Sequence, residues 1–171
     1  MILRCFVSRN KDLLYKAFVS YVRPILEYCS NVWSPYKLKE IRKVEAVQRR
    51  FTKKIFGLSN LSYAKRLKLL KSETLEARRV RSDLCVYYKV LNNMIEPNMI
   101  RFFNIRKCRT RNNGCNLKCN RCKTKIEQNL FRNRHINVWN SLPRDVVLAP
   151  KLSLFKVRLS KINLNKLLVK T

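Results

Sequence analysis

Four of the seven cysteines lie in one short stretch, where their thiols could bind a metal ion together. Their spacing is C-x6-C-x3-C-x2-C, at Cys108, Cys115, Cys119 and Cys122. Two thiolates separated by two residues, as in the last pair, are typical of tetrahedral zinc sites. A separation of three residues is less typical. The sequence therefore leaves two interpretations open: a structural zinc site, or incidental cysteines in a variable loop.

Positive side chains are the second group that could do chemistry, by binding the phosphates of a polyanion. The 171 residues include 39 Lys or Arg against 10 Asp or Glu, a formal net charge of +29. A compact domain with this charge repels itself, and a polyanion relieves the repulsion. Nucleic acid is the first candidate partner and an anionic membrane surface the second. The remaining alternative is a solvated basic surface that has no specific partner.

The best organised cations lie between residues 38 and 55. Residues at three- and four-residue steps form one face of a predicted helix, namely Leu38, Ile41, Val44, Gln48, Phe51 and Ile55. The opposite face is basic, with Lys39, Arg42, Lys43, Arg49, Arg50, Lys53 and Lys54. The pair Arg49-Arg50 lies about one helical turn before the pair Lys53-Lys54, so members of the two pairs can align on one face. These four residues are the principal candidates for phosphate contacts. A second candidate patch comprises Arg78, Arg79 and Arg81. For each residue the alternative is a solvated helix face.

The sequence predicts no catalytic residue. Nucleotide transfer by two metal ions needs paired carboxylates in one pocket, and the three aspartates, Asp12, Asp83 and Asp145, are scattered. Glu73 and Glu76 share a helix face, but their place at a predicted helix start is explained by capping. The sequence also contains no glycine-rich phosphate loop. We therefore expect a binding function, with no small-molecule substrate.

Helices must position these residues, because chain breakers are scarce. Only 2 Gly and 5 Pro occur, which favours an all-α fold. We expect a helical bundle at 1–98, a basic cysteine-bearing connector at 99–128, and a helical C-terminal segment at 129–171. No charge-free stretch approaches the roughly 20 residues of a membrane span, and no secretory pattern is present. We therefore expect no membrane partner and an intracellular protein, in the nucleus or the cytoplasm.

Local signals predict where the first helices begin and bend. A helix over 11–29 is predicted to start at the cap Asn10 and to kink or break at Pro24, which lacks a backbone donor. Its predicted apolar face comprises Leu14, Phe18, Tyr21, Val22 and Ile25. Ser34 followed by Pro35 predicts the start of the next helix.

Several phrases in the chain occur in an order that resembles a known family. They are Tyr21–Tyr28 (YVRPILEY), Val32–Tyr36 (VWSPY), Val47–Thr52 (VQRRFT), Phe56–Tyr63 (FGLSNLSY), Leu75–Asn92 and Asn137–Pro143 (NVWNSLP). The ordered set resembles the C-terminal, thumb and post-thumb region of a jockey-like non-LTR (LINE-type) retrotransposon reverse transcriptase. The resemblance covers about residues 4–160. It departs at Thr110-Arg111, where the family usually continues to a histidine and this chain continues to a cysteine.

The resemblance implies that the first helices form a thumb that grips RNA or an RNA–DNA duplex. The parent enzyme would be an RNA-directed DNA polymerase that uses Mg²⁺. Its palm carries an aromatic-x-Asp-Asp turn, which this chain lacks, so the chain alone is expected not to polymerise. Two alternatives remain: a free-standing basic helical RNA-binding module, and a non-functional remnant of a retroelement.

Overall fold

The computed structural model describes residues 8–95, 98, 101, 103, 105–106, 115–118 and 121–164. These residues confirm the predicted all-α class, because helices predominate and the only strands among them form one short antiparallel pair. That pair joins β1 (Ile105–Arg106) to β2 (Asn116–Leu117), with Ile105 opposite Leu117. The chain divides into two compact units between Arg79 and Val80. The boundary lies inside α7 (Leu75–Leu91), whereas the sequence placed divisions after residues 98 and 128.

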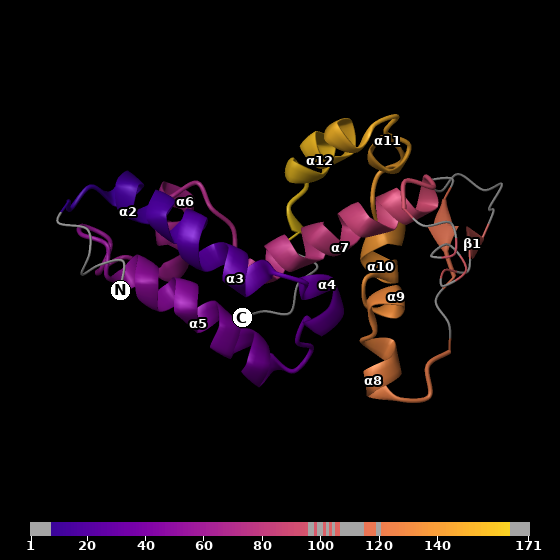
Figure 1. Cartoon of the computed structure of the whole chain (residues 1–171), viewed down its shortest axis with the longest axis horizontal. Helices are drawn as coiled ribbons and strands as arrows, with labels where there is room; N and C mark the ends of the chain where they lie inside the picture. The colour runs from indigo at the N-terminus through magenta and orange to yellow at the C-terminus, as the bar shows by residue number, and fades with distance from the viewer. Residues whose placement is uncertain are drawn as a thin grey trace. The chain divides into compact units, whose positions relative to one another are not determined.

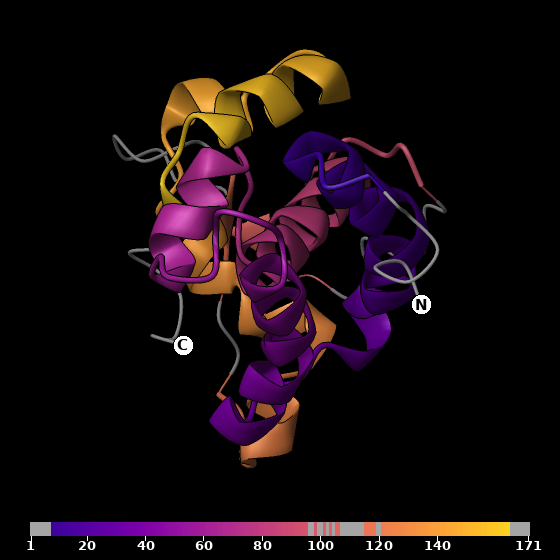
Figure 2. The ribbon, with the colours of Figure 1, turned by 90° about the vertical axis from the view of Figure 1, so that its left-hand side faces the viewer.

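The first unit contains a helical segment in three parts beside a long helix (Figures 1 and 2). The three parts are α2 (Lys11–Ala17), the π-helix η1 (Phe18–Val22) and α3 (Arg23–Glu27). They are followed by α4 (Ser30–Trp33), the long helix α5 (Leu38–Lys53) and α6 (Tyr63–Leu69). The Phe18 ring stacks on Phe51 of α5 with a centroid distance of 4.6 Å. This contact joins the three-part segment to the long helix.

The first helical segment continues through Pro24. Asn10 caps α2 as predicted, since its Oδ1 accepts hydrogen bonds from the backbone N–H groups of Asp12 (2.9 Å) and Leu13 (3.2 Å). The turn before Pro24 widens to a π-helix, in which the N–H of Arg23 bonds to the carbonyl of Phe18. A proline clashes with the carbonyl four residues earlier and cannot bond to it. The wider turn accommodates that carbonyl, and the helix then continues as α3.

The predicted apolar face of this segment is wrong beyond Phe18, because a π-helix interrupts the helical period. Leu14 and Phe18 are buried as expected, but Tyr21 and Ile25 are 66% and 76% exposed. A π-helix has about one more residue per turn than an α-helix. The side chains that follow Phe18 therefore do not stay on the face that a period of 3.6 residues predicts. The predicted apolar face is therefore buried at Leu14 and Phe18 and faces solvent at Tyr21 and Ile25.

The predicted start of the long helix was also wrong. Ser34 and Pro35 follow the short helix α4, and α5 begins at Leu38 with Lys37 as its N-cap. A residue before proline favours an extended backbone, and Ser34 has a ψ of 123°. The chain turns before α4 at Cys29, which has a left-handed φ of 50°. Beyond α5, Gly57 adopts a left-handed φ of 77°.

The second unit packs its C-terminal helices on α7 (Figure 1). After the strand pair come α8 (Lys125–Gln128), α9 (Phe131–Arg134), α10 (Ile136–Asn140), α11 (Arg144–Val147) and α12 (Leu152–Ser160). Trp139 and Phe155 are fully buried in one core with Tyr87 and Tyr88 of α7. The Tyr88 ring stacks on Phe155 with a centroid distance of 4.5 Å. The C-terminal helices thus share a core with α7.

The strand pair of β1 and β2 packs against the core of the second unit. The side chain of Asn140 on α10 bonds to the backbone of Leu117 in both directions, with its Oδ1 accepting and its Nδ2 donating at 2.9 Å. Leu117 itself is buried. At least this part of the predicted connector is therefore fixed to the helices that follow it.

Among the described residues, no helix combines the length and the apolar character needed to cross a membrane.

Candidate nucleic-acid interface

The long helix α5 exposes a cationic face opposite its buried face. Its buried residues are Ile41, Glu45, Gln48 and Thr52, which at about 100° per residue fall within an arc of roughly 60°. The cations around the remaining surface are all exposed: Lys39, Arg42, Lys43, Arg49, Arg50, Lys53 and, at the C-cap, Lys54. The basic face predicted from the sequence period is therefore exposed in the folded chain, but Leu38, predicted for the apolar face, is 43% exposed.

Four of these cations crowd the last turns of α5. Arg49 and Lys53, and likewise Arg50 and Lys54, are four residues apart, a spacing at which like charges destabilise a helix. Part of this cost is offset because Arg50 and Lys53 lie in the last helical turn, where positive charge is favoured. None of the four forms an ion pair within the described part of the chain. A phosphate backbone would supply the missing negative charge.

Arg49 is also oriented by a neighbouring ring. Its guanidinium carbon lies 4.9 Å from the centre of the Tyr63 ring of α6, within the range of a cation–π contact. The guanidinium carbon of Arg66 lies 5.5 Å from the same ring centre. The ring thus holds one of the four exposed cations in place.

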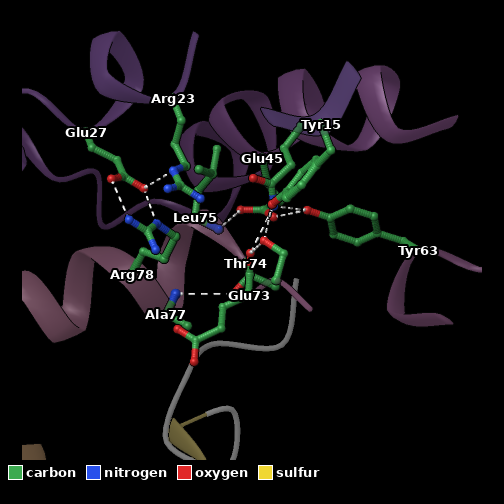
Figure 3. A network of polar contacts seen from close by, with 12 residues as sticks. Tyr15, Arg23, Glu27, Glu45, Tyr63, Glu73, Thr74, Leu75, Ala77 and Arg78 are labelled. Atoms are coloured by element: carbon green, nitrogen blue, oxygen red, sulfur yellow. Dashed lines mark hydrogen bonds and ion pairs between the residues drawn. The ribbon is translucent and has the colours of Figure 1, made fainter. Parts of the chain in front are cut away.

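The opposite face of α5 is fixed by a buried carboxylate (Figure 3). Glu45 is 1% exposed, and its Oε1 accepts a hydrogen bond from the Tyr63 hydroxyl. Its Oε2 accepts a hydrogen bond of 2.9 Å from the backbone N–H of Leu75. Because Leu75 is the first residue of α7, the carboxylate also lies at the positive end of that helix. One side chain of α5 therefore joins α6 and α7.

Two further polar side chains of α5 complete this contact. Gln48 donates from Nε2 to the Tyr63 hydroxyl and to the carbonyl of Glu73, both at 3.0 Å. The hydroxyl of Thr52 donates to the carbonyl of Gln48 at 2.9 Å and accepts from Nε of the buried Arg66 at 3.3 Å. Of the polar residues Glu45, Gln48 and Thr52, the helical period assigned only Gln48 to this face. Glu45 and Thr52 follow Ile41 and Gln48 by four residues, so the spacing contained the signal.

We predict that Tyr63→Phe destabilises the first unit by about 1–3 kcal/mol, because Glu45 then loses a buried hydrogen-bond donor. Burial, followed by the charge of Glu45, raises the pKa of Tyr63. The pKa of a tyrosine in the unfolded chain is near 10. Because the pKa of Tyr63 is higher in the folded chain, its protonated hydroxyl contributes to the free energy of unfolding below about pH 10, and this contribution is lost as the pH rises through the folded-state pKa. The difference between wild type and variant should therefore shrink above about pH 10. Urea unfolding at several pH values measures it.

Tyr36→Phe is the matched control for this experiment, because Tyr36 is exposed. Its stability should stay within about 0.5 kcal/mol of wild type. A Tyr63 variant that is equally neutral would contradict the assigned role of the buried hydroxyl.

The second predicted basic patch is largely engaged within the protein. Arg78 forms an ion pair with Glu27 of α3, with Nη2 donating to Oε2 at 3.0 Å (Figure 3), and this hydrogen bond raises its pKa. Arg79 is 2% exposed. Arg81 donates to the carbonyl of Leu159 and, at 3.2 Å, to that of Ile162. These three residues therefore differ from the exposed cations of α5, and we do not include them in the candidate interface.

The four cysteines proposed as metal ligands are only partly described. Cys108 and Cys119 lie outside the described residues. The thiol of Cys122 is 3.3 Å from Nδ2 of Asn133, and Cys115 packs beside the second core. Within the described ranges, no three His, Cys, Asp or Glu side chains are grouped as metal ligands would be. The zinc site stays a prediction.

The most buried aspartate has a structural role. Asp83 of α7 is fully buried and accepts two hydrogen bonds from Arg134, from Nε at 2.7 Å and from Nη2 at 2.8 Å. Nε2 of His135 lies 3.2 Å from the same carboxylate. The sequence did not predict this cluster, because Asp83 lies about 50 residues before Arg134 and His135 and on a different helix.

Comparison with known proteins adds one relative. The chain is 28% identical over 94 residues to the uncharacterized protein B0403.1 of Caenorhabditis elegans. The alignment covers 53% of the chain and 48% of the relative, so the chain spans about half the length of that protein. No family model and no solved structure matches the chain.

Proposed function

We propose that this chain binds nucleic acid through the exposed cationic face of α5, as the thumb and C-terminal part of a retrotransposon reverse transcriptase. The observation that carries the proposal is the cluster Arg49, Arg50, Lys53 and Lys54 on one exposed surface, with no acidic partner among the described residues. The buried contacts of Glu45 and Gln48 fix the helix behind that surface. A rigid cationic face of this kind suits a phosphate backbone.

The resemblance described above supports the same residues. The phrase Val47–Thr52 lies within α5 and contains Arg49 and Arg50, both of them exposed. In the parent family a thumb would hold RNA or an RNA–DNA duplex while a separate palm, with Mg²⁺, performs the chemistry. We infer that this chain contributes binding and no polymerisation, because its sequence lacks the paired carboxylates of such a palm.

Salt dependence of binding tests the proposal. We expect the wild-type chain to bind a fluorescein-labelled RNA–DNA duplex and duplex DNA with little sequence preference. On duplex DNA, the logarithm of the association constant should fall with log[salt] with a slope of about −3.6 or steeper, since each of four phosphate contacts contributes about −0.9. Fluorescence anisotropy between roughly 50 and 300 mM KCl measures this slope. Binding that is absent or insensitive to salt would contradict the proposal.

A further inference from the structure

A second exposed surface of the first unit is formed by aromatic and aliphatic side chains near the turn between α3 and α4. Tyr21, Ile25, Tyr28 and Val32 are 66%, 76%, 76% and 84% exposed. Tyr21 and Ile25 lie four residues apart in the helical segment, and Tyr28 follows three residues later as the C-cap of α3, spacings at which side chains of a helix are neighbours. Large exposed side chains that gather on one surface, instead of lying singly, mark a candidate binding site.

The backbone beneath this surface is held in place. The indole Nε1 of Trp33 donates to the carbonyl of Tyr28 at 2.6 Å, across the turn at Cys29. Glu27, which precedes Tyr28, is paired with Arg78 of α7 and lies 3.9 Å from Nε of Arg23 (Figure 3). The rings of Tyr21 and Tyr28 therefore project from a constrained segment, so little conformational entropy is lost when they bind a ligand.

The charge of the first unit as a whole selects the chemistry of the partner. Residues 8–79 contain 18 Lys or Arg and six Asp or Glu. Of the acidic residues, Glu45 and Glu76 are buried, while Glu27 and Glu40 are paired with cations. The unit is therefore complementary to a polyanion. A single-stranded nucleic acid offers negative charge together with accessible base faces, whereas the bases of a duplex are already stacked.

We propose that Tyr21 and Tyr28 stack on unpaired bases of single-stranded RNA or DNA. Two helical turns separate the rings, about 10 Å along the axis, so each ring can stack on a different base. The inference rests on the proposed function, because the exposed cations of the same unit supply the contacts to the backbone. It adds a preference for single strands that a cationic helix alone does not provide.

Paired substitutions distinguish stacking from simple apolar contact. Tyr21→Leu combined with Tyr28→Leu removes both rings but keeps apolar side chains, and Tyr21→Phe combined with Tyr28→Phe keeps the rings. We expect the Leu variant to lose about 5- to 150-fold in affinity for a single-stranded oligonucleotide for each base that was stacked. The Phe variant should bind as wild type does. Both variants should bind duplex DNA within about twofold of wild type.

Tryptophan fluorescence gives a second measurement. Trp139 is fully buried, whereas Trp33 is 41% exposed and bonded to the backbone of Tyr28. Quenching by added single strands should therefore report on this surface, and it should be weaker in the Leu variant. Circular dichroism establishes that both variants are folded, which is expected because the two tyrosines are exposed.

The possible outcomes separate this inference from the proposed function. Single-strand affinity that is unchanged in the folded Leu variant overturns the stacking proposal, while salt-dependent duplex binding still supports the role of α5. Failure of the wild-type chain to bind either nucleic acid overturns both. Analytical ultracentrifugation tests whether a second copy of the chain covers this surface. If the wild type self-associates and the Leu variant is monomeric, the surface is an interface between copies, and the stacking proposal is overturned.

Discussion

Replacing Arg49, Arg50, Lys53 and Lys54 together with Ala is expected to weaken binding to duplex DNA on the order of 10²–10³-fold near 0.15 M salt. Each phosphate contact releases condensed counterions and contributes a factor of roughly 5 at that salt concentration. The slope of log affinity against log[salt] should become less steep by about 3.6, or by about 2.8 on single strands. Fluorescence anisotropy over a range of KCl concentrations measures both quantities.

The fold should survive this change. The four side chains are exposed, and Ala is the best helix former. The main loss is the contact of Arg49 with the Tyr63 ring, about 0.5–1 kcal/mol at an exposed site. Circular dichroism and urea unfolding check that the helix remains intact.

A matched variant removes the same charge elsewhere in the first unit. Lys11, Lys16, Lys65 and Lys68 are exposed cations on α2 and α6. If their replacement by Ala reduces the slope as much as the α5 variant does, net charge explains binding and the α5 surface has no special role. A folded α5 variant that keeps the full wild-type slope would contradict the proposed interface directly.

Replacing Asp83 with Ala is expected to destabilise the second unit by about 3–5 kcal/mol. The Asp83 side chain is fully buried and that of Arg134 is 7% exposed. Removal of one partner of a buried ion pair leaves the other charge buried and uncompensated. The loss is a large fraction of the total stability of an ordinary domain. Denaturant unfolding followed by Trp139 fluorescence in a Trp33→Phe background measures it in this unit.

Two comparisons show whether burial causes this loss. Lys43→Ala breaks an exposed pair with Glu40, in which the side chains are 63% and 46% exposed, and should cost at most about 1 kcal/mol. Asp83→Leu combined with Arg134→Met should be less destabilising than Asp83→Leu alone, because no unpaired charge remains. An Asp83→Ala variant that loses less than about 1 kcal/mol would show that Arg134 finds water or another partner.

Local sequence determined the helical class, the Asn10 cap and the cationic face of α5. Each depends on interactions within a few residues. A cap needs a side chain and the next N–H groups, and an amphipathic face needs only a helical period. For this reason the exposure of Arg49, Arg50, Lys53 and Lys54 could be predicted before the structure was known.

Tertiary structure decided the features that depend on distant residues. The π-helix before Pro24 and its stacking on α5 turned Tyr21 and Ile25 toward solvent, against the predicted apolar face. Glu45 became a buried link between helices only because Tyr63 and the start of α7 meet it. Arg78, a predicted nucleic-acid contact, forms an ion pair with Glu27, 51 residues away. Whether a given charge faces solvent or a partner depends on which helices pack together, and a helical period alone does not contain that information.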